Sequence, residues 1–299
     1  MKSLVTLRGV LPPMVTPFKE NGDVDYDAFV RNIERWNNDP LGGYLVLGSN
    51  SETPYLSETE KLTLIELTVR AAKKGRFILV GTGLESARET IRLTNEAARR
   101  GAHAALVLTP FYYGDQMNDS ALVGYFTAVA DASDIPILIY NVPKFTRLNI
   151  SVNAVKAIGG HPNIVGMKDS LGDVAQLKKF KGVVPEEFRL IVGSASAWYP
   201  GLELGLDTAI LAVANCLPVA CSDIQQLFTS NEHSHAKDLQ ARVNPVNKAV
   251  TETFGVAGLK IASTLMGYEG GIPRNPLRPL TDLQRDEICK TLEKAGFLR

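Results

Sequence analysis

The sequence predicts a (β/α)8 TIM barrel followed by a C-terminal helical extension. Short apolar runs alternate with longer helical patterns along the 299 residues, and no linker rich in glycine, proline or serine divides them. Strands that alternate with helices indicate βαβ units and a parallel sheet. Eight such units in about 220 residues fit one closed barrel. An open doubly wound sheet is the structural alternative, but the Gly-x-Gly-x-x-Gly turn typical of dinucleotide-binding sheets does not follow the first run.

Eight apolar runs are the predicted strands. Each is short and rich in aliphatic residues, as expected of a strand in a buried sheet. In chain order they are residues 10–15, 43–47, 77–80, 104–108, 135–140, 164–167, 190–192 and 209–213. The first run contains Pro12 and Pro13.

Helical patterns lie between these runs. Residues 25–37 place Phe29, Ile33 and Trp36 on one helix face. Residues 120–130 are also predicted to be helical.

Two further helices carry start or stop signals. Ser57 begins one, and Glu60 three residues later completes the spacing of a capping box. Residues 86–100 form another, which Gly101 is expected to end.

The last part of the chain is helical in pattern and longer than one closing helix needs. We therefore expect residues 1–222 to form the barrel and residues 223–299 to form a helical extension. The extension is expected to pack on the barrel as part of a single structural unit.

Composition excludes several classes of function. The formal net charge is zero and no run rich in lysine or arginine occurs, so a nucleic-acid partner is not expected. No apolar run approaches the ~20 residues of a membrane span, so no membrane partner is expected either. Three cysteines provide no disulfide framework, which favours a reducing, cytoplasmic setting. The four histidines show no ligand spacing at the strand ends, so no metal is expected.

Chemistry in a barrel of this type gathers where strands end and βα loops begin. Ser49 and Asn50 follow the second run, Tyr140 ends the fifth, and Lys168 stands where the sixth should end. A lysine at the edge of an apolar strand can lose proton affinity through desolvation. Its neutral amine is then a nucleophile for a carbonyl substrate. Each residue also has a structural interpretation: a solvated lysine at a strand–loop junction, a packing tyrosine, and a turn.

Three motifs together resemble one family. They are Gly48-Ser49-Asn50-Ser51-Glu52, Tyr140-Asn141-Val142-Pro143 and Val165-Gly166-Met167-Lys168-Asp169-Ser170. In order and spacing the chain resembles the dihydrodipicolinate synthase / N-acetylneuraminate lyase family of class I pyruvate aldolases, from Gly9 to about Pro279. The resemblance implies a (β/α)8 barrel with a helical extension, usually assembled as a homotetramer of two tight dimers.

The resemblance also implies roles for individual residues. Lys168 matches the Schiff-base lysine and Tyr140 the general acid/base. Ser49 stands where the family has a hydroxyl that links this tyrosine to one from the neighbouring subunit, and Tyr112 matches that neighbouring tyrosine.

The remaining implied site residues bind the substrate. Asn50 matches a residue that binds the substrate carboxylate. Gly193 and the backbone carbonyl of Ile210 match positions that line the pocket.

Two positions depart from the family pattern. Phe145 stands where dihydrodipicolinate synthases have an arginine for the second substrate's carboxylate, and a phenyl ring cannot replace a bidentate guanidinium. Lys144 or Arg147 could compensate. Ser51 replaces the glycine of the first motif, which costs about 1 kcal/mol if that residue must adopt a positive φ.

These residues favour one activity within the family. The Ser49-Asn50 pair and residues 161–170 are most like 4-hydroxy-2-oxoglutarate aldolase. We expect cleavage of a 4-hydroxy-2-oxo acid, namely 4-hydroxy-2-oxoglutarate, to pyruvate and glyoxylate through a Schiff base on Lys168, without a cofactor. The alternatives are a 2-keto-3-deoxy sugar-acid aldolase or dehydratase, and dihydrodipicolinate synthase, which condenses pyruvate with aspartate semialdehyde.

Two rivals lie outside this chemistry. In a pyridoxal-phosphate barrel Lys168 would hold the cofactor aldehyde, but the sequence lacks a convincing phosphate-binding loop. A ligand-binding barrel without turnover is disfavoured because Lys168, Tyr140 and Ser49 are all retained.

Overall fold

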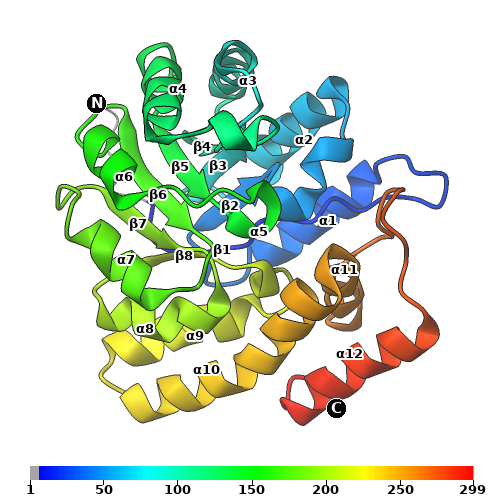
Figure 1. The fold of residues 1–299 in the computed structure, drawn as a ribbon. Helices are drawn as coiled ribbons and strands as arrows, with labels where there is room; N and C mark the ends of the chain where they lie inside the picture. Colours follow the sequence, from blue (N-terminus) through cyan, green and yellow to red (C-terminus); the bar gives the residue numbers. More distant parts are fainter. Residues whose placement is uncertain (1–6, 299) are drawn as a thin grey trace.

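Eight parallel strands surrounded by helices form the barrel in the computed structural model, which confirms the predicted fold class (Figure 1). The structure describes residues 7–298; residues 1–6 and 299, at the two ends of the predicted barrel and extension, lie outside it. The strands are β1 (Gly9–Leu11), β2 (Gly43–Val46), β3 (Phe77–Gly81), β4 (Ala104–Leu108), β5 (Ile137–Asn141), β6 (Ile164–Asp169), β7 (Arg189–Val192) and β8 (Thr208–Ile210). Their order in the sheet is β1-β8-β7-β6-β5-β4-β3-β2.

The barrel closes between β1 and β2. The backbone hydrogen bonds that join them are Gly42 N–H to Val10 O (2.9 Å), Leu45 N–H to Pro12 O (3.1 Å) and Met14 N–H to Leu45 O (2.9 Å). The first strand was expected to span residues 10–15, but regular pairing ends at Leu11. Pro12 and Pro13 have no N–H to donate to a ladder, so the chain continues extended with a single bridge from Pro13 to Leu45. The eighth strand is likewise shorter than residues 209–213, because the chain turns into a 3₁₀ helix at Ala212.

Helices cover the outside of the barrel. They are α1 (Tyr26–Trp36), α2 (Glu58–Ala71), α3 (Ala87–Arg99), α4 (Asp119–Asp131), α5 (Pro143–Thr146), α6 (Val152–Ile158), α7 (Val174–Lys181), α8 (Trp198–Glu203) and α9 (Pro218–Thr229). The predicted capping box is confirmed, since Ser57 and Glu60 exchange both hydrogen bonds. Gly101 ends α3 with a φ of +96°, a conformation that side chains rarely adopt.

The chain continues past α9 into further helices. These are α10 (His233–Lys248), a π-helical turn η7 (Ala249–Thr253), α11 (Gly255–Leu265) and α12 (Asp282–Lys294). They lie together on one side of the barrel, with α10 against α8 and α9 (Figure 1). The predicted division after residue 222 falls within α9. Over residues 7–298, every helix is too short or too polar to cross a membrane.

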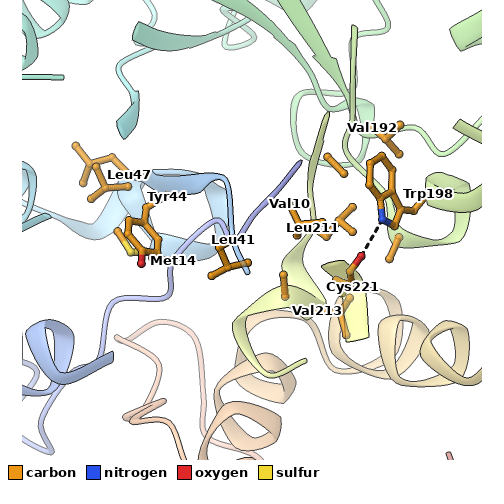
Figure 2. Close-up of a cluster of buried hydrophobic side chains, with 14 of the residues drawn as sticks. Val10, Met14, Leu41, Tyr44, Leu47, Val192, Trp198, Leu211, Val213 and Cys221 are labelled. Carbon is orange, nitrogen blue, oxygen red and sulfur yellow. Dashed lines mark hydrogen bonds between the residues drawn. The ribbon is translucent and has the colours of Figure 1, made fainter. Parts of the chain in front are cut away.

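The buried apolar side chains form two layers. The inner layer fills the barrel and includes Leu45, Leu79, Leu106, Leu138 and Ile191. The outer layer lies between strands and helices, and Figure 2 shows part of it. There Trp198 donates its Nε1–H to the carbonyl of Cys221 at 3.0 Å. The large indole is therefore buried without leaving its polar group unpaired.

Arg274, between α11 and α12, ties the extension to the barrel. Its guanidinium forms a bidentate ion pair with Glu60 of α2, at 2.5 and 2.9 Å. Both side chains are largely buried, at 17% and 20% exposed. The hydrogen bonds from Arg274 hold the pKa of Glu60 down to about 2.

We predict that Glu60→Gln lowers the free energy of unfolding at pH 7 and makes it depend less on pH in the acid range. Because the native pKa of Glu60 is depressed, its contribution is present above the unfolded pKa near 4.5 and is lost as pH falls toward 2. The expected loss at pH 7 is on the order of 2 kcal/mol. Urea unfolding between pH 2 and pH 7 measures it. Glu287→Gln, on an exposed face of α12, is the control, and equal effects of the two substitutions would contradict the assignment.

Candidate active site

Tyr140 and Lys168 are direct neighbours across the paired strands β5 and β6. Both are buried, at 6% and 4% exposed, and Lys168 Nζ lies 4.2 Å from the centroid of the Tyr140 ring. The sixth strand was expected to end before Lys168, but it runs on through Asp169. Asp169 pairs with both neighbouring strands, so Lys168 lies within the sheet rather than at a strand–loop junction.

Strand alternation directs this pair into the barrel. Tyr140 belongs to the inner apolar layer together with Leu138 and Val142, the residues two positions before and after it. Lys168 lies opposite Tyr140 in the parallel register and takes the same side of the sheet. The amine and the phenol therefore lie at the carboxyl ends of their strands, where barrels of this type carry chemistry.

A short turn after β2 brings a hydroxyl to this pair. Ser49 opens the 3₁₀ turn η2 (Ser49–Ser51), and its Oγ lies 3.2 Å from the Tyr140 hydroxyl. Asn50 lies in the same turn and is partly exposed. The positive φ values of this loop belong to Leu47 (59°) and Glu52 (54°), so the condition under which Ser51 would be strained is not met. Ser51 is instead buried, and its hydroxyl donates to the Met14 carbonyl at 2.6 Å.

Gly193 and Ile210 follow on the next strands. Gly193 comes directly after β7, and a Cβ there would lie 2.2 Å from Ser170 Oγ and 2.6 Å from the Asp169 carbonyl oxygen. Only glycine fits that close approach. Ile210 ends β8 and is fully buried in the inner layer.

Ser170 is a polar group that sequence reasoning did not select. Its Oγ is buried and has no hydrogen-bond partner among residues 7–298. It lies two residues after Lys168 in sequence, and that spacing is the signal that could have selected it. Buried hydroxyls are normally paired, so Ser170 offers a hydrogen bond beside Gly193.

Asn141 and Asp169 form a second network that the sequence did not reveal. Each follows a predicted catalytic residue, and the two are paired in register. Asn141 Nδ2 donates to Asp169 Oδ1 and to Asn149 Oδ1, both at 2.8 Å, while its Oδ1 accepts from Ile150 N–H at 3.1 Å. Gln176 Nε2 donates to the other Asp169 oxygen at 3.3 Å. Burial raises the pKa of Asp169, and the hydrogen bond from Asn141 opposes this shift.

Tyr112 lies away from this group of side chains in its own chain. It is 75% exposed on the loop after β4, and its ring packs edge-on against Tyr113 with centroids 5.0 Å apart. The backbone N–H groups of Phe111 and Tyr112 donate to Glu85 Oε2, at 3.0 and 2.9 Å. The loop is thus anchored while its aromatic side chains face outward.

The residues near the family's arginine position lie on α5 and the turn after it. Phe145 is 50% exposed. The Lys144 ammonium donates to the Thr251 carbonyl of η7, so it already has a partner. Arg147 is exposed and has a φ of +59°.

The chain matches known proteins along nearly its whole length. A sequence profile described as the dihydrodipicolinate synthetase family matches residues 6–295. The 4-hydroxy-tetrahydrodipicolinate synthase of Macrococcus caseolyticus is 32% identical and covers 96% of this chain and 95% of its own.

Two solved structures show the same architecture. The dihydrodipicolinate synthase of Acinetobacter baumannii, complexed with pyruvate, has a TM-score of 0.90 at 28% identity and covers 98% of this chain and 100% of its own. The KD(P)GA of T. tenax has a TM-score of 0.87 at 26% identity and covers 96% of this chain and 99% of its own.

We predict that Asn141→Ala destabilises the protein strongly, by about 2–4 kcal/mol. The substitution removes a donor from buried Asp169 and leaves the Ile150 N–H without its acceptor. Urea unfolding measures the loss. Gln176→Ala is the matched control, since Gln176 lies at the partly exposed edge of the same network, and it should cost about 1 kcal/mol or less. Similar small losses for both variants would show that the network contributes little.

Proposed function

The chain belongs to the dihydrodipicolinate synthetase family of pyruvate-dependent carbon–carbon lyases and synthases, and we propose that it forms a Schiff base between Lys168 and pyruvate. The observation that carries this proposal is the buried Lys168 amine beside Tyr140, whose hydroxyl lies 3.2 Å from Ser49 Oγ. This combination provides an amine nucleophile and a hydroxyl pair for proton transfer.

The covalent bonds in this mechanism form between the Lys168 amine and the substrates, and between the two substrates. The neutral Lys168 amine attacks C2 of pyruvate to give a carbinolamine, which loses water to form an iminium ion. The iminium accepts the electron pair when a proton leaves C3, and the resulting enamine attacks the carbon of an aldehyde to form the new C3–C4 bond. Hydrolysis of the iminium then frees the amine. Cleavage of a 4-hydroxy-2-oxo acid is the reverse sequence.

Tyr140 supplies the proton in our proposal. It protonates the oxygen of the new C4 alcohol in the condensation direction and removes that proton during cleavage. The Ser49 hydroxyl passes the proton onward, and Tyr112 of a neighbouring copy completes the relay. Proton transfer by positioned side chains contributes about 10²–10⁴-fold to such reactions. Asn50 holds the pyruvate carboxylate, and Gly193 and the Ile210 carbonyl line the pocket.

Two reactions compete for the second substrate. The name of the Macrococcus relative favours condensation, and we propose condensation with aspartate semialdehyde as the first candidate. The sequence motifs favoured cleavage of 4-hydroxy-2-oxoglutarate and gave condensation as an alternative. The order of these two candidates is therefore reversed here. Phe145, half-exposed at the position where the resemblance expects an arginine, favours 4-hydroxy-2-oxoglutarate cleavage as the second candidate. A 2-keto-3-deoxy sugar acid is the third, supported by the likeness to the T. tenax structure.

We also propose that the protein is a homotetramer. The exposed Phe111, Tyr112 and Tyr113 form an apolar surface suited to a second copy of the chain. The free cysteines Cys216, Cys221 and Cys289 support the proposal of a cytoplasmic setting.

Borohydride reduction in the presence of pyruvate should trap a pyruvyl adduct on Lys168. Intact mass and peptide mapping identify the adduct and its position. Lys168→Ala, which has no amine there, should form none. If the folded wild-type protein gains no adduct, the Schiff-base mechanism is wrong. The pyridoxal-phosphate barrel and the ligand-binding barrel without turnover would then be the remaining interpretations.

Tyr112→Phe should lower kcat by about 10²-fold, because it interrupts a proton relay. It should leave trapping of pyruvate on Lys168 unchanged, since that step precedes the relay. Steady-state kinetics at matched oligomeric state, checked by sedimentation, measures the effect. Tyr113→Phe is the matched control on the same loop. Equal kcat values for wild type and Tyr112→Phe would rule out the shared site.

Phe145→Arg should raise kcat/KM for aspartate semialdehyde by about tenfold or more, because an arginine–carboxylate contact contributes about 1.5–3 kcal/mol. Phe145→Leu, which adds no charge, should not. Condensation is followed with pyruvate and aspartate semialdehyde, and cleavage with 4-hydroxy-2-oxoglutarate. A wild-type enzyme that cleaves 4-hydroxy-2-oxoglutarate and does not condense aspartate semialdehyde would reverse the order of the candidates.

A further inference from the structure

Glu52 ends the loop that carries Ser49 and Asn50, and its conformation is unusual. Its backbone is left-handed, with φ 54° and ψ 37°. A residue with a Cβ pays roughly 1–2 kcal/mol for this conformation. Its side chain is only 1% exposed, and a buried carboxylate is unfavourable unless it is paired. Strained residues of this kind persist only where the surrounding structure holds them.

Lys260 of α11 pairs with this carboxylate. Its Nζ lies 2.6 Å from Glu52 Oε1 and is itself fully buried. The same ammonium donates to the Ile272 carbonyl at 2.6 Å and lies 4.4 Å from the Phe18 ring centroid. Burial lowers the pKa of Lys260 to about 8, while the Glu52 carboxylate opposes the shift.

A second group from the extension completes the contact. The Arg274 backbone N–H donates to Glu52 Oε2 at 2.8 Å. The Arg274 guanidinium donates to the carbonyls of Gly22 and Tyr55 besides its ion pair with Glu60. Residues of the C-terminal extension thus hold both oxygens of the Glu52 carboxylate. Arg274 is in turn bound to the N-terminal part of the barrel through Gly22, Tyr55 and Glu60.

The other hydrogen bonds that hold this loop join uncharged groups. Ser51 Oγ donates to the Met14 carbonyl at 2.6 Å, and Thr53 Oγ1 donates to the Gly48 carbonyl at 2.8 Å. The backbone N–H of Glu52 donates to the Ser49 carbonyl at 3.2 Å. This hydrogen bond connects Glu52 directly to Ser49.

We propose that Glu52 and Lys260 are positioning residues of the active site. Their buried ion pair lets the C-terminal extension set the shape of the loop that presents Asn50 to the pyruvate carboxylate and Ser49 to Tyr140. The ion pair touches no reacting atom, and Lys168 is held by its own strand. Loss of the pair therefore weakens pyruvate binding more than it slows Schiff-base formation at saturating pyruvate. This inference rests on the proposed function.

The double variant Glu52→Gln/Lys260→Met tests the proposal, because it removes both buried charges together. Lys168 trapping by borohydride is followed across pyruvate concentrations in the full-length protein. We expect the half-saturating pyruvate concentration to rise tenfold or more and the rate at saturating pyruvate to fall less than threefold. Glu52→Gln alone is the second variant, in case the double variant does not fold; it keeps the side-chain volume, and the same rise is expected.

Glu269→Gln is the matched control. It breaks the ion pair between Arg31 and Glu269, which also joins the extension to the barrel but connects to α1 rather than to the loop. Its half-saturating pyruvate concentration should stay within twofold of wild type.

The outcomes separate the two proposals. A half-saturating concentration that is unchanged in the Glu52 variants, with trapping intact in wild type, overturns the positioning role alone, even if thermal stability falls. Absence of trapping in wild type overturns the proposed function instead. Equal rises in the Glu52 variants and in Glu269→Gln also overturn the specific role of the pair.

Discussion

The parallel pairing of β5 with β6 is the constraint on which the rest of the site depends. This register sets Tyr140 beside Lys168 on the inner side of the sheet. The same register sets Asn141 beside Asp169 on the outer side, where Asn141 donates hydrogen bonds to Asp169 and to Asn149. Because strand side chains alternate, a slip of one residue would exchange the two faces and destroy both arrangements. One register thus provides the pair for which we propose the chemistry and the polar network behind it.

Barrel closure brings Ser49 to Tyr140 and Lys168. In the sheet, β2 is separated from β5 by β3 and β4, so Ser49 approaches Tyr140 across the barrel mouth rather than from a neighbouring strand. The 3.2 Å contact between their hydroxyl oxygens therefore depends on the curvature of the whole sheet. That curvature is maintained where the backbone around Pro12 bonds to β2.

The C-terminal extension supplies positively charged partners for two carboxylates of the barrel. Arg274 pairs with Glu60 on α2, and Lys260 pairs with Glu52 at the end of the loop that carries Ser49 and Asn50. Buried carboxylates need such partners, so the helices that follow the barrel are part of the structure that shapes its mouth. The extension also meets α5, where Lys144 donates to the Thr251 carbonyl of η7 and Phe145 stays exposed.

The sequence by itself determined the (β/α)8 fold, the capping box at Ser57, the helix end at Gly101 and the residues at the strand ends. These features follow from local hydrophobic periodicity and local hydrogen bonds, which a single sequence displays. Only the tertiary structure decided that β6 continues through Asp169 and that Glu52, not Ser51, takes the left-handed conformation. It also brought together Glu52 with Lys260, and Asn141 with Asp169. Those contacts join residues that are distant in sequence, and their proximity exists only once the sheet has closed and the extension has packed against it.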